Sequence, residues 1–254
     1  VFLMILTAVS FVLLPKLPAL HTWEVEAREE RIAEEEFAQS QVTMQNLKIK
    51  EQNEAAGAKG ELSIRLPEGV TGDQIAVSND YVTQTIRVEI PQADRTYFDS
   101  YPVLGNSDYI DGLSYTRQGE MGVIEVTTNK VYELQTEYDA QNFYFNFLTP
   151  HEVYDKVVVI DAGHGGRAVG ANKQGINEKD IDLVLRLKEI FDNSDQNIGV
   201  YYTRTDDSNP TFDQRVQLAN KSDADLFISI HNNSTRSGRM SGTSGTQVMY
   251  DETS

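Results

Sequence analysis

The 254-residue sequence contains no cysteine, a single tryptophan and only four histidines. Without cysteine, disulfides cannot hold the fold together and no thiol chemistry is available. Basic residues are also scarce, since 22 lysines and arginines stand against 39 acidic residues and give a formal net charge of −17. This balance argues against a nucleic-acid partner, because binding to phosphate backbones needs basic patches.

Two of the few histidines end short apolar segments that are typical of buried strands. His164 lies in 157–166 (VVVIDAGHGG) and His231 in 225–233 (DLFISIHNN). A single histidine at a strand end is usually only a polar residue in a loop. In open parallel sheets, however, ligands bind beyond the carboxyl ends of the strands, which is where both histidines are expected. With Glu178 between them, they make up a ligand set for a catalytic zinc ion with one open position.

The sequence between the histidines alternates helical and strand patterns. Residues 180–191 predict a helix with Asn177 as its cap, 198–203 a strand, and 211–220 a short helix. This order predicts right-handed crossovers and a parallel or mixed sheet flanked by helices. The residues expected to face the core are Ile181, Val184, Leu185, Leu187, Ile190 and Phe191 in the first helix, and Phe212, Val216 and Ala219 in the second.

A competing motif occurs at 163–168, where GHGGRA matches the G-x-G-x-x-A pattern of dinucleotide-binding folds. That pattern requires a helix that opens at the glycines, whereas residues 168–177 predict a Gly/Asn loop. No acidic residue ends the following strand at the spacing that ribose binding needs. We therefore predict that no nucleotide binds here.

Several motifs occur in the order that is typical of one known family. They are DAGHGG at 161–166, NEK at 177–179, YTRTD at 202–206, Arg215 with Ala219 and Asn220, and SIHNN at 229–233. Together they resemble the zinc-dependent N-acetylmuramoyl-L-alanine amidases of the type 3 family. The resemblance covers about residues 156–254.

The resemblance implies that His164, Glu178 and His231 hold one Zn²⁺ ion. It also implies cleavage of the amide between N-acetylmuramic acid and the first L-alanine of the peptidoglycan stem peptide. The family has a further glutamate, a general acid/base, on a strand that we expect beyond Ser254, so no catalytic residue is assigned in this chain. We expect the domain at 156–254 to be truncated and to hydrolyse its substrate poorly.

Three polar residues in these motifs have weaker interpretations. Arg204, Asp206 and Arg215 are candidates to orient loops or Glu178 around the metal. Surface ion pairs are the alternative that the sequence leaves open.

The N-terminal part predicts attachment to a membrane. Residues 1–14 are apolar except for Thr7 and Ser10, and we interpret 1–20 as an uncleaved anchor or signal segment rather than a buried core helix. Residues 21–58 are rich in Glu, Ala, Gln and Arg and predict an acidic helical stalk.

Residues 59–150 alternate apolar and polar side chains, as half-buried antiparallel strands do. The predicted strands are 61–66, 85–90, 122–127, 132–137 and 142–147. They form a separate β-rich, sandwich-like domain that resembles the wall-binding β domains found in this family, with a purely structural spacer as the alternative. Residues 149–155 are the predicted junction.

The combined prediction is a membrane-anchored peptidoglycan hydrolase of the bacterial envelope that acts outside the cytoplasm. The net negative charge gives no attraction to an anionic cell wall, so recognition should rely on hydrogen bonds and zinc. One alternative is an inactive peptidoglycan-binding protein with an amidase-like fold. Another is a structural scaffold, in which the two histidines would be incidental.

Overall fold

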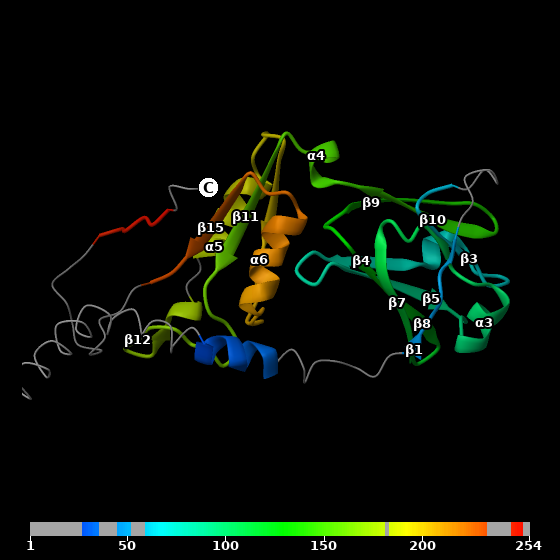
Figure 1. Cartoon of the computed structure of the whole chain (residues 1–254), viewed down its shortest axis with the longest axis horizontal. Coiled ribbons are helices and arrows are strands. Elements are labelled where there is room, and N and C mark those ends of the chain that lie inside the picture. Colours follow the sequence, from blue (N-terminus) through cyan, green and yellow to red (C-terminus); the bar gives the residue numbers. More distant parts are fainter. Residues whose placement is uncertain (1–26, 36–44, 52–58, 181–182, 233–244, 251–254) are drawn as a thin grey trace, which may run out of the picture.

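The computed structural model describes residues 27–35, 45–51, 59–180, 183–232 and 245–250. An all-β part and an α/β part lie side by side along the long axis (Figure 1). The predicted mixed α/β composition is confirmed.

The all-β part consists of two five-stranded sheets. Their strands are antiparallel except for the short parallel pair β2 and β6. Alternate side chains of β5 and β10 point into one core that contains residues of both sheets, among them Val88 and Phe145, which are fully buried. The first sheet has the order β1 (Gln45–Asn46), β7 (Ile110–Gln118), β8 (Met121–Thr128), β5 (Thr85–Pro91) and β4 (Ala76–Asp80); the second has β2 (Lys50–Glu51), β6 (Leu104–Gly105), β3 (Leu62–Arg65), β10 (Asn142–Leu148) and β9 (Glu133–Tyr138).

All five predicted strands of this part are present, as β3, β5, β8, β9 and β10. The strands β4 and β7, the helix α3 (Arg95–Ser100) and the 3-10 turn η2 (Gly72–Gln74) were not predicted. The predicted stalk at 21–58 is wrong where β1 and β2 lie, because these strands pair with β7 and β6. Backbone pairing with existing sheet edges thus overrides the helical composition of that segment.

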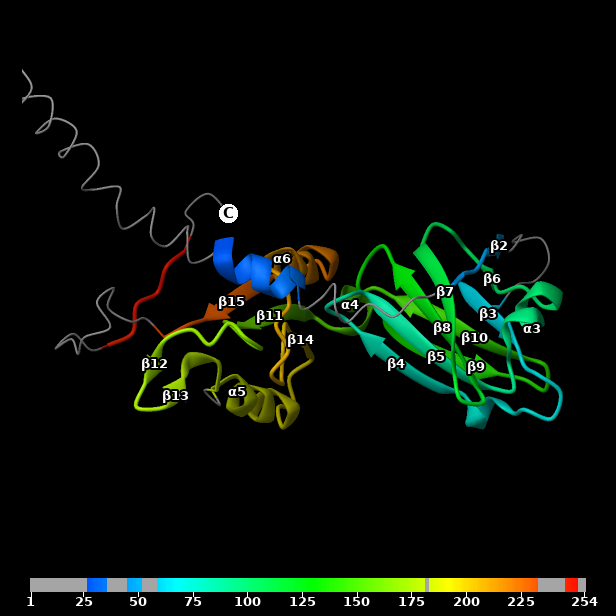
Figure 2. The same ribbon diagram turned by 90° about the horizontal axis from the view of Figure 1, so that it is seen from below.

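The α/β part is built on a sheet of order β14 (Ile198–Tyr202), β11 (Lys156–Ala162) and β15 (Leu226–Ile230). Both strand pairs are parallel, as the strand–helix order predicts. Successive side chains of β11 enter different cores, since Val159 packs with Leu218 of α6 (Phe212–Lys221) and Ile160 packs with Val184 of α5 (Leu183–Asp192). The two helices therefore cover opposite faces of the sheet (Figure 2).

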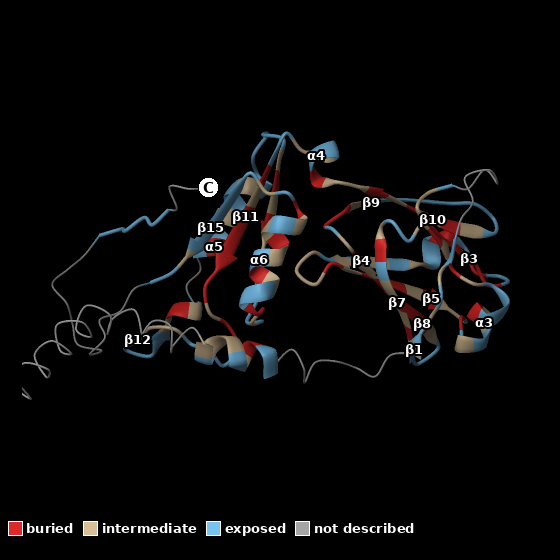
Figure 3. Cartoon of the chain, viewed as in Figure 1, coloured by how far each residue is buried: buried red, intermediate tan, exposed pale blue. Residues whose placement is uncertain are grey.

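Both helices bury only part of the face that the sequence predicts, and Ile181 lies outside the described residues. In α5, Leu185 and Ile190 are exposed, and the buried stripe is the narrower one of Val184, Leu187 and Phe191. In α6, Phe212 and Val216 are exposed, whereas Leu218 and Arg215 are buried. Figure 3 shows that buried, intermediate and exposed residues all occur along this helix. The ion pair of Arg215 described below turns α6 to this face.

The predicted cap of the first helix is also wrong. Asn177 lies in β13 (Ile176–Asn177), which pairs with β12 (Asn172–Lys173), and its side-chain amide donates to Asp180. A 3-10 turn, η3 (Glu178–Asp180), follows at once, and α5 is described over Leu183–Asp192.

The two parts of the molecule share an apolar core and a carboxylate. Val131 of the all-β part packs with Val157, Val159, Tyr201 and Leu218 of the α/β part. Glu133 at the start of β9 accepts hydrogen bonds from the hydroxyls of Tyr81 (2.9 Å) and Tyr201 (2.6 Å). Burial, followed by the hydrogen bond and charge of Glu133, raises the pKa of Tyr201 far above its usual value, so this hydroxyl remains a donor. The junction itself contains a short helix, α4 (Pro150–Val153).

The predicted anchor at 1–20 lies outside the described residues. In the part of the chain that the structure describes, no helix is long and apolar enough to cross a membrane. Residues 27–35 do form a helix, here called the N-terminal helix, but it is not a free stalk (Figure 1, blue). Ala33 is only 2% exposed, and Glu30 accepts a hydrogen bond from the backbone of Phe212.

Candidate metal centre

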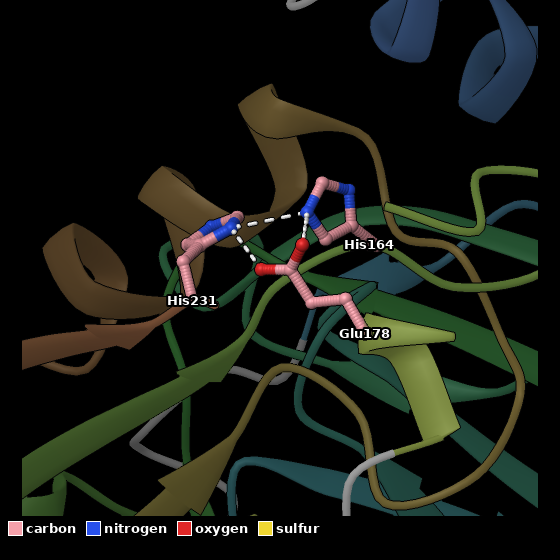
Figure 4. A group of neighbouring side chains, drawn as sticks. All are labelled: His164, Glu178 and His231. Carbon is pink, nitrogen blue, oxygen red and sulfur yellow. Dashed lines mark hydrogen bonds and ion pairs between the residues drawn. The ribbon is translucent and has the colours of Figure 1, made fainter. Parts of the chain in front are cut away.

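Three side chains from three separate elements converge beyond the carboxyl edge of the parallel sheet. His164 follows β11, His231 follows β15, and Glu178 opens η3 (Figure 4). The Nε2 atom of His164 lies 3.0 Å from Oε2 of Glu178 and 3.2 Å from Nδ1 of His231. The distance from His231 Nδ1 to Glu178 Oε1 is also 3.2 Å. The structure thus brings together all three predicted ligands.

The donor geometry fits a zinc ion. Zinc binds imidazole nitrogen and carboxylate oxygen at about 2.0–2.2 Å with tetrahedral geometry, which places neighbouring donors about 3.3–3.5 Å apart. The observed separations of 3.0–3.2 Å are within a few tenths of an ångström of that spacing. A glycine keeps the space beside the donors open, because a Cβ on Gly170 would lie 2.7 Å from both His164 Nε2 and Glu178 Oε2.

Glu178 is held ionised in a buried position, with a side chain only 5% exposed. The backbone N–H groups of Ala171 and Asn232 each donate to one of its oxygens. Burial opposes ionisation, but the hydrogen bonds from the two histidines and from these amides outweigh it and hold the pKa of Glu178 well below its usual range. A carboxylate fixed in this way is a preformed anionic ligand.

The two histidines differ in exposure, and the neighbours of His164 shift its pKa. Burial alone would lower the pKa of His164, but hydrogen bonds and charges from Glu178 and Glu29 raise it to about 9. A metal that binds at this ring must therefore displace a proton. The side chain of His231 is 46% exposed, against 10% for His164. The site is thus closed on the His164 side and accessible beside His231.

The loop that carries His164 depends on unusual backbone conformations. His164 has φ 62°, in the left-handed region that few side chains adopt outside functional sites. Its neighbour Gly163 is essential for space, since a Cβ there would lie 2.3 Å from the His231 ring. No helix opens at these glycines; Gly165 and Ala168 instead form an isolated β-bridge. The G-x-G-x-x-A match is therefore no nucleotide-binding turn.

Comparisons with known proteins identify the segment that contains this site. The family model described as N-acetylmuramoyl-L-alanine amidase matches residues 158–254. We call residues 158–254 the amidase segment after this match, and they contain His164, Glu178 and His231.

Part of the chain is also similar to individual curated proteins. The chain is 41% identical over 78 residues to the N-acetylmuramoyl-L-alanine amidase CwlM of Bacillus licheniformis, an alignment covering 30% of this chain and 31% of CwlM. It is 43% identical over 86 residues to an endolysin of Bacillus phage SPP1 (33% of this chain, 31% of the endolysin). It is 40% identical over 91 residues to the amidase AmiC of Escherichia coli (35% and 22%). The chain therefore spans less than half the length of these relatives.

One solved structure is similar to part of the chain. It is the catalytic domain of CwlV, an N-acetylmuramoyl-L-alanine amidase from Bacillus (Paenibacillus) polymyxa var. colistinus. The identity is 36% and the TM-score 0.29, with 32% of this chain and 47% of that chain covered.

Within the amidase segment, a buried ion pair supports the loop of His164. Arg215 is 5% exposed, and its Nη1 atom donates to Asp161 Oδ1 (2.7 Å) and to the carbonyl of Ala162 (2.7 Å). Its Nη2 atom donates to the carbonyl of His164 at 2.9 Å. Arg215 thus ties the end of β11 to the left-handed residue, and the alternative of a surface ion pair is wrong for it.

Arg204 has a related role, but Asp206 does not. Arg204 donates to the carbonyls of Ala162 (3.1 Å), Gly163 (2.7 Å) and Lys179 (3.1 Å), so it links the loop of His164 to the turn of Glu178. The carboxylate of Asp206 instead accepts from the backbone of Ser208. Of the two interpretations left open, these contacts favour loop orientation for both arginines, whereas the Asp206 carboxylate caps its own turn and its carbonyl accepts from Arg204.

Two contributors were missed at the sequence level. Asp161 accepts hydrogen bonds from Ser229 and Thr203 in addition to Arg215. An acidic residue at the end of the apolar run 157–160 was an available signal for this role, since a buried charge needs a partner. Glu29 forms a hydrogen bond with His164, which is 135 residues away, and no sequence pattern indicated this contact.

Proposed function

We propose that this chain is a zinc-dependent N-acetylmuramoyl-L-alanine amidase that cleaves the amide between N-acetylmuramic acid and L-alanine in peptidoglycan. His164, Glu178 and His231 are proposed to hold the ion. The observation that carries the proposal is the convergence of two imidazoles and one ionised carboxylate at 3.0–3.2 Å within a segment of the amidase family.

The residues of the chain supply a prepared site for amide hydrolysis. Zinc bound there would act as a Lewis acid that polarises the amide carbonyl and makes a water molecule more acidic. Glu178 contributes a fixed negative charge, while two imidazoles contribute none when neutral, so the ion keeps a net positive charge. The exposure of His231 leaves the approach to the site open to a polymeric substrate.

The identity of the cleaved bond tests this proposal. Purified peptidoglycan incubated with the zinc-loaded protein should release free L-alanine amino groups and no new reducing sugar ends, and the release should be slow because no general acid/base is assigned in this chain. Removal of zinc with a chelator should stop the release, and added zinc should restore it. New reducing ends, or release that persists without metal, would contradict an amidase mechanism.

The intact ligand set favours an enzyme over the alternative of an inactive peptidoglycan-binding protein. A binding module would gain nothing from a buried, ionised Glu178 that two backbone amides hold in place. The scaffold alternative fails for the same reason, because burying an ionised carboxylate without a role costs free energy.

We further propose an envelope location, with residues 1–20 as a membrane anchor and residues 59–150 as a wall-binding domain. Support for the anchor comes from the apolar run at 1–14. The 254-residue protein should sediment with membranes and be released by detergent but not by high salt, whereas a variant that starts at Lys59 should remain in the supernatant. Recovery of both forms in the soluble fraction would refute the anchor.

A further inference from the structure

The N-terminal helix (residues 27–35) lies against the amidase segment beside the metal centre, as Figure 4 shows at the upper right. Three of its carboxylates contact that segment. Glu29 Oε1 lies 3.0 Å from His164 Nδ1, Glu30 accepts from the backbone N–H of Phe212 at 2.6 Å, and Glu35 pairs with Arg167 at 3.2 Å. Contacts of one helix with three separate sites fix its position and orientation.

Two of these contacts are more than exposed ion pairs. The Glu30 carboxylate accepts a hydrogen bond from the backbone N–H of Phe212, the first residue of α6. N–H groups in the first turn of a helix have no partner within the helix and lie at the positive end of its dipole. Ala33 is one turn beyond Glu29 and is buried. The same face of the N-terminal helix therefore carries Glu29 and the packing contact, so Glu29 is directed at His164 by the docking of the helix. The Glu35–Arg167 pair is exposed and contributes little.

Glu29 contacts the ring nitrogen of His164 that does not face Glu178 and His231. His164 directs Nε2 toward Glu178 and His231, and Nδ1 toward Glu29. Glu29 is therefore not one of the converging donors. Metal-ligating histidines commonly donate their second N–H to a carboxylate, which fixes the tautomer and ring orientation and makes the ligand more basic.

We propose that Glu29 is a positioning residue of the metal centre, which accepts the Nδ1 proton of His164 and thereby presents Nε2 as an unprotonated donor. This proposal rests on the zinc site of the proposed function. It means that the segment before the all-β part completes a centre whose three ligands lie more than 130 residues further along the chain. The backbone of His164 is fixed by the hydrogen bond from Arg215 to its carbonyl, which keeps the ring beside Glu29.

The test compares zinc affinities of the full 254-residue chain and its variants by competition with a chromogenic chelator. Glu29→Ala should weaken zinc binding about 10- to 100-fold, the range typical for loss of an outer partner. Glu29→Gln keeps a neutral acceptor and should fall between Glu29→Ala and the unsubstituted chain. The matched control is Glu34→Gln, an exposed carboxylate on the same helix, which should bind zinc within about twofold of the unsubstituted chain.

A second measurement separates positioning from general destabilisation. In the zinc-loaded protein, NMR should show a slowly exchanging Nδ1 proton of His164, which disappears in Glu29→Ala while the thermal unfolding midpoint remains nearly unchanged. Unaltered zinc affinity in Glu29→Ala, or faster hydrolysis at unaltered affinity, would overturn the proposal and mark the helix as a cover over the site. Failure of the unsubstituted chain to bind zinc would overturn the proposed function as well.

Discussion

Replacing either metal-facing histidine by alanine should abolish stoichiometric zinc binding. His164→Ala and His231→Ala each remove one of three donors, and the remaining pair holds an ion far less tightly. The loss should exceed the 10- to 100-fold that an outer partner contributes. Metal analysis after gel filtration should give about one zinc ion per chain for the unsubstituted protein and close to none for either variant. Hydrolysis of peptidoglycan should be lost in parallel.

A third histidine provides the control for these variants. His151 in α4 hydrogen-bonds to the carbonyl of Asp223 and belongs to the junction between the two parts of the molecule. His151→Ala should therefore retain about one zinc ion per chain. One zinc ion per chain in both His164→Ala and His231→Ala would show that the ion binds elsewhere.

Removing the charge of Asp161 should produce the largest loss of stability. Asp161→Asn leaves the Arg215 guanidinium buried without its counter-charge, which typically costs about 3–5 kcal/mol of the free energy of unfolding. The effect should be visible as a large decrease in the denaturant midpoint. Zinc affinity should fall too, because Arg215 also holds the carbonyl of His164.

An exposed pair and the pH dependence provide controls for this variant. Lys188 and Asp192 form an i, i+4 pair on the surface of α5, so Asp192→Asn should cost no more than about 0.5 kcal/mol. Burial opposes ionisation of Asp161, but the charge of Arg215 and hydrogen bonds from Ser229 and Thr203 lower its pKa. The stability that ionised Asp161 contributes is therefore fully present above its unfolded-state pKa of about 3.9. It is lost as the pH falls from that value through the lower pKa of the folded state. Equal acid sensitivity of the Asp161→Asn variant and the unsubstituted chain would contradict this assignment.

Sequence patterns correctly predicted those elements whose local hydrophobic pattern matches their burial in the folded protein. The strands before His164 and His231 are short apolar runs, and burial on both faces of a parallel sheet produces that pattern. Their order with the intervening helices fixed the edge on which the ligands meet. The convergence of His164 and His231 was predictable because both follow strands that the sequence marks clearly, whereas β12, β13 and η3 around Glu178 were not predicted.

The remaining features depend on contacts between distant residues. The face of α6 turned inward is selected by Arg215, a charged residue that hydrophobic periodicity counts as exposed. The N-terminal helix has the composition of a solvated stalk, yet its carboxylates find a histidine, a helix terminus and an arginine in the amidase segment. β1 and β2 are two-residue strands that exist only because β7 and β6 offer open edges. No local pattern could have shown any of these contacts.

The shared carboxylate of Glu133 has a consequence for how this protein can be divided. Tyr81 and Tyr201 come from the two parts of the molecule, and both donate to it. Cutting the chain at the junction would leave the Tyr201 hydroxyl without its acceptor and expose the apolar side chains of Val157 and Leu218 to water. An amidase fragment prepared in this way would expose an apolar surface on the face of the sheet that α6 covers. Removal of the all-β part would thus create an aggregating fragment, and reduced activity of such a fragment would be no measure of wall binding.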